Sequence, residues 1–332
     1  MPDFNDIIGQ PQITEHFKSA VEQNKVSHAY IICGERYSGK EYIAKIFAAA
    51  LLCDSNENRP CNNCQACSQS FSDNNPDIVK VTHEKPMIIS VDDIRTQVNE
   101  DIVIKPYGGK RKIYIINEAE KMNQQAQNAL LKTLEEPPEY AVILLLTTNL
   151  EEMLPTIRSR CVVLNMRPVA DKEVRKYLME EEQLPDYKAD MSVAFARGNL
   201  GKAKLLAKNE EFDEIMNEAL HLMHHLKDLE VYELNKCVKR ANDFKIAIGD
   251  YLDLISVWYR DALVFKATAD ADSLIFKDEM KYIRKVADCT TYENLQDIID
   301  AIDKAKKRIS ANVNFDLTME LLFLTLQEKD SV

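Results

Sequence analysis

The sequence predicts an α/β domain followed by two all-helical domains. Up to about residue 167, short runs rich in Ile, Val and Leu alternate with helical patterns, as in a parallel sheet covered by helices. Beyond Pro168 these runs vanish, and apolar residues recur at helical spacing with few Gly or Pro. A chain of 332 residues is long enough for two or three domains of about 100 to 150 residues. We therefore expect domains over 1–167, 168–208 and 209–332.

Five apolar runs predict the strands of the sheet, because buried strands are rich in Ile, Val and Leu. These runs are 29–33, 78–81, 113–116, 142–146 and 162–164. Between them, helical patterns lie near 12–23, 41–52, 91–100 and 123–135. Ser90 and Asp93 stand at the spacing of a capping box, which predicts that the third helix begins there.

Composition and charge limit the classes of function. The net charge of −12 disfavours a protein that grips nucleic acid alone, because Lys and Arg supply most of the affinity for phosphates. The N-terminus shows no signal-peptide pattern, and no uncharged apolar run approaches the roughly 20 residues of a membrane helix. We expect a cytoplasmic protein that shares any DNA contact with partners.

A decayed phosphate-binding loop follows the first predicted strand. The segment from Gly34 to Glu41 has the spacing GxxxxGK, with Gly39 and Lys40 in place, and a helical pattern comes next. Such a loop points backbone N–H groups at phosphates, and Lys40 would reach the terminal ones. The last position needs a Ser or Thr hydroxyl to bind magnesium, but Glu41 brings a carboxylate. We expect weakened nucleotide binding; the alternative is a glycine-rich turn that arose by chance.

Four cysteines form a cluster in the polar segment after this helix. Cys53, Cys61, Cys64 and Cys67 have the spacing C-x7-C-x2-C-x2-C. Four thiolates can close a tetrahedral Zn²⁺ shell without leaving a position for water, so the sequence predicts a structural zinc site. The alternative is four buried free thiols. We expect the remaining cysteines to be ordinary buried thiols: Cys33, Cys161, Cys237 and Cys289.

A second nucleotide motif ends the strand predicted over 113–116. An apolar strand followed by acidic residues is expected there, and Asn117 and Glu118 follow this one. Asn117 stands where an Asp would organise magnesium, and an amide brings no charge to a metal. Asn117 is therefore, after Glu41, the second magnesium-binding position at which the expected side chain is missing.

From residue 3 to about 206, the chain resembles the clamp-loader branch of the AAA+ ATPases. The resemblance rests on the motifs above and on three further segments: 8–10 (IGQ), 128–138 (NALLKTLEEPP) and 159–161 (SRC). It implies an AAA+ nucleotide-binding-like α/β domain with a zinc module at 53–67, then a small helical lid domain and a helical collar domain for oligomerisation.

The resemblance also assigns roles to single residues. In this family the SRC segment carries an arginine finger that reaches the ATP site of a neighbouring subunit, which gives that role to Arg160. A guanidinium suits it because it stays charged and forks onto phosphate oxygens; the alternative is an Arg in a surface ion pair. Thr148 falls at the sensor-1 position, where the alternative is a polar strand cap. Gly201 stands where active members carry the sensor-2 arginine.

Glu41, Asn117 and Gly201 all depart from the active pattern, so the resemblance implies a non-hydrolysing subunit of the DNA polymerase III holoenzyme. Its implied partners are delta and gamma or tau subunits in a five-membered ring, the beta sliding clamp and primed DNA. An ATP-hydrolysing subunit of the gamma or tau type would carry Ser or Thr at 41, Asp at 117 and Arg at 201. A zinc-containing DNA-binding regulator would need a basic face. Lys40 leaves weak nucleotide binding open.

Overall fold

The computed structural model describes residues 1–85, 88–108, 110–208, 210–243, 248–311 and 313–330. The chain divides into two compact units: Met1–Tyr177 with Arg197–Lys202, and Leu178–Ala196 with Ala203–Val332. The division into three domains stays a prediction, and residue 209, at one of its boundaries, lies outside the described residues.

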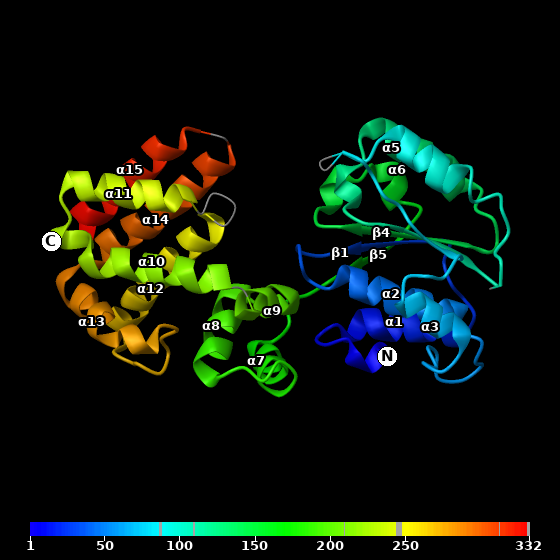
Figure 1. Cartoon of the computed structure of the whole chain (residues 1–332), viewed down its shortest axis with the longest axis horizontal. Helices are drawn as coiled ribbons and strands as arrows, with labels where there is room; N and C mark the ends of the chain where they lie inside the picture. Colours follow the sequence, from blue (N-terminus) through cyan, green and yellow to red (C-terminus); the bar gives the residue numbers. More distant parts are fainter. Residues whose placement is uncertain (86–87, 109, 209, 244–247, 312, 331–332) are drawn as a thin grey trace. The chain divides into compact units, whose positions relative to one another are not determined.

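The first unit contains a five-stranded sheet and short helices (Figure 1). The strands are β1 (Ala29–Cys33), β2 (Ile78–Lys80), β3 (Lys112–Ile116), β4 (Ala141–Thr147) and β5 (Val162–Asn165). Its α-helices are α1 (Pro11–Glu22), α2 (Lys40–Leu52), α3 (Gln65–Phe71), α4 (Val91–Ile94), α5 (Gln124–Glu135) and α6 (Pro155–Arg158). Shorter helical turns are η1 (Phe4–Asp6), η2 (Arg95–Asn99), η3 (Ala119–Lys121) and η4 (Leu150–Glu152). The predicted strands are confirmed to within a residue at each end.

The sheet is parallel throughout, in the order β2-β3-β4-β1-β5. Alternate side chains of each strand point to opposite faces, so both faces are apolar and both are covered. Tyr30 and Ile32 pack with α1 and α2, whereas Ala29 and Ile31 belong to the core beneath α5 and α6. Figure 1 shows these two helical layers on either side of the sheet. The carboxyl ends of β1, β3 and β4 therefore meet at one edge.

The predicted capping box is confirmed, but the α-helix that it begins is short and continues as a π-helical turn. Asp93 N–H donates to Ser90 Oγ at 3.3 Å, and Ser90 N–H donates to Asp93 Oδ2 at 2.8 Å. The α-helix ends at Ile94, and the chain continues as the π-helical turn η2. Asn99 in this turn bonds to α5, where its Nδ2 donates to the Ala129 carbonyl at 3.0 Å.

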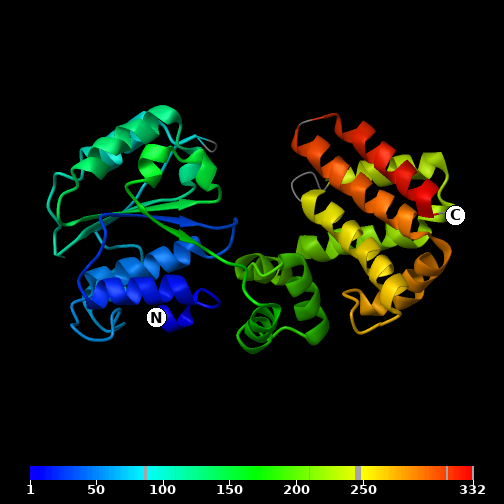
Figure 2. The ribbon, with the colours of Figure 1, turned by 180° about the vertical axis from the view of Figure 1, so that it is seen from behind.

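The rest of the described chain is helical, as predicted. The α-helices are α7 (Asp171–Glu180), α8 (Asp186–Ala196), α9 (Leu200–Lys208), α10 (Glu210–His225), α11 (Val231–Asp243), α12 (Ile248–Thr268), α13 (Met280–Cys289), α14 (Tyr292–Ser310) and α15 (Phe315–Asp330), with the turns η5 (Leu226–Asp228) and η6 (Lys277–Glu279). Trp258 and Tyr259 are 1% and 0% exposed, so α12 lies at the centre of this helical core. Figure 2 shows α14 and α15 side by side in the second unit. Among the described residues, no helix is long and apolar enough to cross a membrane.

Candidate functional site

The glycine-rich loop borders a hollow of about 880 Å³ at the carboxyl edge of the sheet. The loop runs from the end of β1 into α2, and Gly39 at the helix start has φ +92°, a conformation that favours glycine. The hollow brings together most of the predicted nucleotide-site residues: Gly39, Lys40, Glu41, Asn117, Glu118 and Thr148. Gly34 begins the loop but does not line the hollow.

Lys40 is engaged with its own loop. Its Nζ donates to the carbonyl oxygens of Gly34 at 2.7 Å and Glu35 at 2.6 Å. Burial lowers the pKa of Lys40, and nearby carboxylates, first among them Glu120, oppose that shift. To reach a terminal phosphate, this ammonium would have to leave both carbonyls, which reduces the gain from binding.

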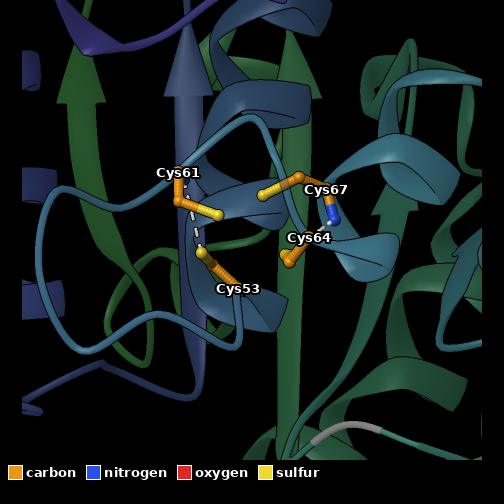
Figure 3. A group of neighbouring side chains, drawn as sticks. All are labelled: Cys53, Cys61, Cys64 and Cys67. Atoms are coloured by element: carbon orange, nitrogen blue, oxygen red, sulfur yellow. Dashed lines mark hydrogen bonds between the residues drawn. The ribbon is translucent and has the colours of Figure 1, made fainter.

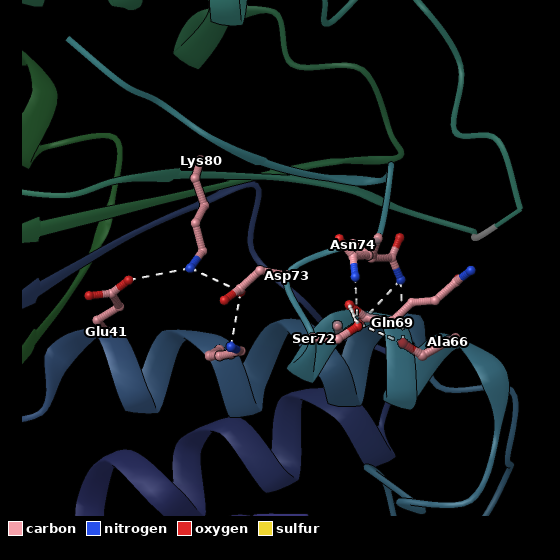
Figure 4. Close-up of polar contacts among 10 residues, drawn as sticks. Glu41, Ala66, Gln69, Ser72, Asp73, Asn74 and Lys80 are labelled. Atoms are coloured by element: carbon pink, nitrogen blue, oxygen red, sulfur yellow. Dashed lines mark hydrogen bonds and ion pairs between the residues drawn. The ribbon is translucent and has the colours of Figure 1, made fainter. Parts of the chain in front are cut away.

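Glu41 is held by an ion-pair chain that leads away from the loop (Figure 4). Its Oε1 lies 3.4 Å from Nζ of Lys80 on β2, and the same ammonium lies 3.0 Å from Oδ1 of Asp73. Asp73 comes just after α3 and also pairs with Lys45 on α2 at 2.9 Å. Hydrogen bonds from Lys45 and Lys80 lower the pKa of Asp73. At the position predicted for the magnesium-binding hydroxyl, the chain therefore has an exposed carboxylate that pairs with Lys80, and Lys80 also pairs with Asp73.

Thr148 is held by Glu120, a residue that our sequence interpretation missed. Thr148 Oγ1 donates to Glu120 Oε1 at 2.7 Å, and Thr148 N–H donates to Oε2 at 3.2 Å. Burial alone would raise the pKa of Glu120, but the hydrogen bonds to its carboxylate, led by the one from Thr148, lower it. Glu120 stands two residues beyond Glu118 in the same acidic segment, which was the available signal. The hydroxyl of Thr148, the residue predicted at the sensor-1 position, thus already bonds to a carboxylate.

The charged side chains that line the hollow are mostly acidic. Carboxylates outnumber cations along its lining: Glu35, Glu41, Glu118 and Glu120 against Arg36 and Lys40. Glu118 pairs with Lys121 at 2.5 Å. Asn117 replaces an aspartate without adding a charge that a metal could use. A phosphate would meet like charge here, which disfavours binding.

The segment around Gly201 closes against the phosphate loop. Asn199, which is 6% exposed, donates from Nδ2 to the Arg36 carbonyl at 2.8 Å. A Cβ added to Gly201 would penetrate the carbonyl oxygen of Tyr37. The sequence indicates that an arginine has been lost at Gly201. The structure adds that only glycine fits so close to the Tyr37 carbonyl.

We expect Gly201→Ala to lower the stability of the unit that contains the loop by about 1 to 3 kcal/mol, because the Tyr37 peptide must move. Thermal unfolding measures the change. Gly249→Ala is the matched control, because a Cβ at this helical glycine meets no atom within 4 Å. The control should be neutral or slightly stabilising. Equal unfolding temperatures for Gly201→Ala and the unchanged chain would contradict the close approach.

Arg160 lies outside the lining of the hollow, just beyond α6. Its Nη2 pairs with Oε1 of Glu135 at 2.8 Å, and its Nη1 donates to the Thr156 carbonyl at 2.9 Å. The structure thus shows the surface ion pair that was the alternative for this residue. The side chain of Arg160 stays 36% exposed in this pair.

The cysteine cluster is assembled as the spacing predicts (Figure 3). The sulfur atoms of Cys53, Cys61, Cys64 and Cys67 all lie within 4.8 Å of one another, so these four thiols could hold a metal ion. Cys53 caps the end of α2 and Cys64 caps the start of α3, where its Sγ accepts from Cys67 N–H at 3.4 Å. Hydrogen bonds, led by one from the Asn63 backbone, lower the pKa of Cys61 to about 6, which favours the thiolate that a metal needs. Burial raises the pKa of Cys53 and Cys67, so metal binding would have to displace their protons.

The other cysteines follow the sequence prediction only in part. Cys237 is buried, as predicted, and Cys33 and Cys161 are half-buried. The prediction is wrong for Cys289, which is exposed because it is the last residue of α13 and lies beyond the residues through which that helix packs.

The fold and the loop define the class, and comparison with known proteins gives the family. A parallel sheet of this order, with a glycine-rich loop between β1 and α2, makes this an AAA+ protein. A family model described as DNA polymerase III, delta subunit, matches residues 9–170, and its C-terminal counterpart matches 210–328. DNA polymerase III subunit delta-prime of Bacillus subtilis (strain 168) is 30% identical over 323 residues, 96% of each chain. The chain belongs to the DNA polymerase III delta-prime family.

Two further proteins show the breadth of the similarity. DNA polymerase III subunit tau of Bacillus subtilis (strain 168) is 26% identical over 92% of this chain, which spans 58% of the tau subunit. The solved structure of a DNA polymerase III gamma subunit-related protein from Thermotoga maritima is 23% identical. The match covers 96% of this chain and 99% of that chain, with a TM-score of 0.49.

Proposed function

We propose that the chain is a non-hydrolysing subunit of a clamp loader, which helps to place the beta sliding clamp on primed DNA with ATP bound by other subunits. The observation that carries the proposal is the state of the phosphate-loop hollow. Lys40, Glu41 and Thr148 are each engaged by groups of the same chain, and Gly201 closes on the loop. Its partners are delta and gamma or tau subunits in a five-membered ring.

Arg160 supplies the active contribution of the chain in this proposal. It reaches into the ATP site of a neighbouring subunit, where a guanidinium stabilises the charge that develops on the transferred phosphoryl group. Its position outside the hollow, and its exposure, support a role toward another chain.

The metal in the proposal is a structural zinc ion held by Cys53, Cys61, Cys64 and Cys67. Four sulfur donors suit Zn²⁺, and they leave no position for a reacting water. The chain 54–63 has few apolar residues to form a core of its own, so metal bonds would fix its course.

The collar role of the last helices is supported by an exposed apolar face on α15. Leu317, Leu321 and Leu324 follow one another at helical spacing and are 54%, 45% and 44% exposed. Such a face gains free energy when a partner covers it, at roughly 25 cal/mol for each Å² buried. It suits contact with the collar helices of other subunits.

An ATP-hydrolysing subunit is the alternative within the same loader. The glycine spacing, Lys40 and the similarity to the tau subunit favour it. Glu41, Asn117 and Gly201 oppose it, because together they remove the magnesium hydroxyl, the magnesium carboxylate and the sensor arginine.

Reconstitution of the loader from its separate subunits tests the proposal. We expect clamp loading on primed DNA to require this chain and to require Lys40 much less, since the hollow carries no turnover. Lys40→Ala in this chain should therefore load the clamp at close to the normal rate. Loading that proceeds without the chain, or that stops with Lys40→Ala in a chain that still folds, would overturn it.

A further inference from the structure

We propose that Glu135 is a positioning residue for Arg160, which holds the guanidinium in the orientation that meets a phosphate of the neighbouring subunit. The inference rests on the proposed role of Arg160 in trans. Glu135 is the last residue of α5, and Arg160 lies just after α6. The two side chains meet with Arg160 Nη2 at 2.8 Å from Glu135 Oε1, and both are partly exposed.

The stability of α5 does not explain a carboxylate at this position. The last carbonyls of a helix carry partial negative charge, so a glutamate at the C-terminal end is unfavourable for the helix, whereas Lys132 in the same turn is favourable. Glu135 is compensated by the guanidinium of Arg160. The ion pair with Arg160 therefore explains the carboxylate of Glu135 better than the stability of α5 does.

Arg160 makes three contacts within the chain, and the longest of them joins its Nη1 to Ser159 Oγ at 3.4 Å. Its Nη1 donates to the Thr156 carbonyl at 2.9 Å, and one Nη2–H points to Glu135. A guanidinium carries five N–H donors, so these contacts leave donors that can bond to phosphate oxygens. A side chain already fixed at two points has less rotational freedom to lose when the transition state forms.

Arg158, the last residue of α6, and Glu151 of η4 provide a matched comparison close to Arg160 in the sequence. Arg158 Nη1 lies 3.0 Å from Glu151 Oε1, and the side chains are 29% and 79% exposed. This pair has the same chemistry as the Arg160 pair but does not involve the finger residue. A change at Glu151 therefore controls for the loss of one surface ion pair.

The test uses the full loader, reconstituted with variants of this chain, and measures DNA-stimulated ATP turnover. We expect Glu135→Gln to lower kcat at the affected site about fivefold, the upper range for an exposed ion pair, without changing KM for ATP. Glu135→Asp, which keeps the charge, should restore part of the rate. Glu151→Gln should leave it unchanged. Thermal unfolding of each chain verifies that the variants are folded.

A double variant decides whether Glu135 acts through Arg160. In an Arg160→Ala background, Glu135→Gln should have no further effect. If it lowers the rate as much there as in the unchanged chain, Glu135 acts by another route and the inference is overturned. If Arg160→Ala lowers turnover but Glu135→Gln does not, only the positioning role fails. If Arg160→Ala itself changes nothing, the proposed function of Arg160 fails first.

Discussion

Arg160→Ala is expected to slow hydrolysis by about 10³-fold or more at the single ATP site that this chain faces, while the chain itself stays folded. Arginine fingers supplied in trans contribute about 10³ to 10⁵ to kcat in related phosphoryl-transfer reactions. Arg160 is 36% exposed and makes one surface ion pair, so its removal should change the stability of the isolated chain by less than about 1 kcal/mol.

A single-turnover measurement resolves this effect better than a steady-state rate. Other ATP sites of the loader keep their own catalytic groups, so the total rate falls by less than the rate at one site. We expect the rapid phase of ATP cleavage to lose the amplitude of one site. Arg158→Ala is the control, because Arg158 is a neighbouring arginine in a similar pair with Glu151. An unchanged amplitude with Arg160→Ala would remove Arg160 from catalysis.

Cys67→Ser is expected to release about one zinc ion per chain and to unfold the segment 53–71 locally. Apparent binding energies of structural zinc reach about 10 to 16 kcal/mol, and Cys67→Ser removes one of the four thiolates that supply this energy. Cys67 is fully buried and belongs to α3, so the loss should also loosen that helix. Metal analysis and limited proteolysis measure the two effects.

Cys289→Ser is the matched control for the zinc prediction. Cys289 is an exposed thiol outside the cluster, so its replacement should change neither zinc content nor proteolysis. Zinc at well under one ion per chain in the unchanged protein, purified without chelator, would contradict the metal assignment. So would retention of the full zinc content by Cys67→Ser.

The sheet and the phosphate loop could be predicted because their signals are local. Strands buried on both faces read as continuous Ile, Val and Leu runs, and a glycine-rich loop has a fixed spacing. The cysteine cluster was predictable for the same reason, since its spacing alone limits which sulfur atoms can meet. The π-helical turn after Ile94 was not predicted, because the apolar pattern of 91–100 fits a continuous helix.

The state of the nucleotide site depended on contacts between distant residues. Lys80 on β2 pairs with Glu41 at the start of α2. Glu120, which follows β3, accepts a hydrogen bond from Thr148, which follows β4. Gly201 touches the loop from a helix far along the chain. No periodicity or motif records such pairs, so the sequence could show only which catalytic groups were lost. It could not show that Glu41 and Thr148 form contacts with other side chains of the same chain.

Titration of the isolated chain with a fluorescent ATP analogue, with and without Mg²⁺, followed by an assay of phosphate release, shows whether the hollow binds and hydrolyses ATP. We expect no magnesium-dependent binding and no phosphate release, because Glu41 pairs with Lys80 and the charged side chains that line the hollow are mostly acidic. Binding that strengthens with Mg²⁺ and leads to phosphate release would show an active motor subunit and contradict the account.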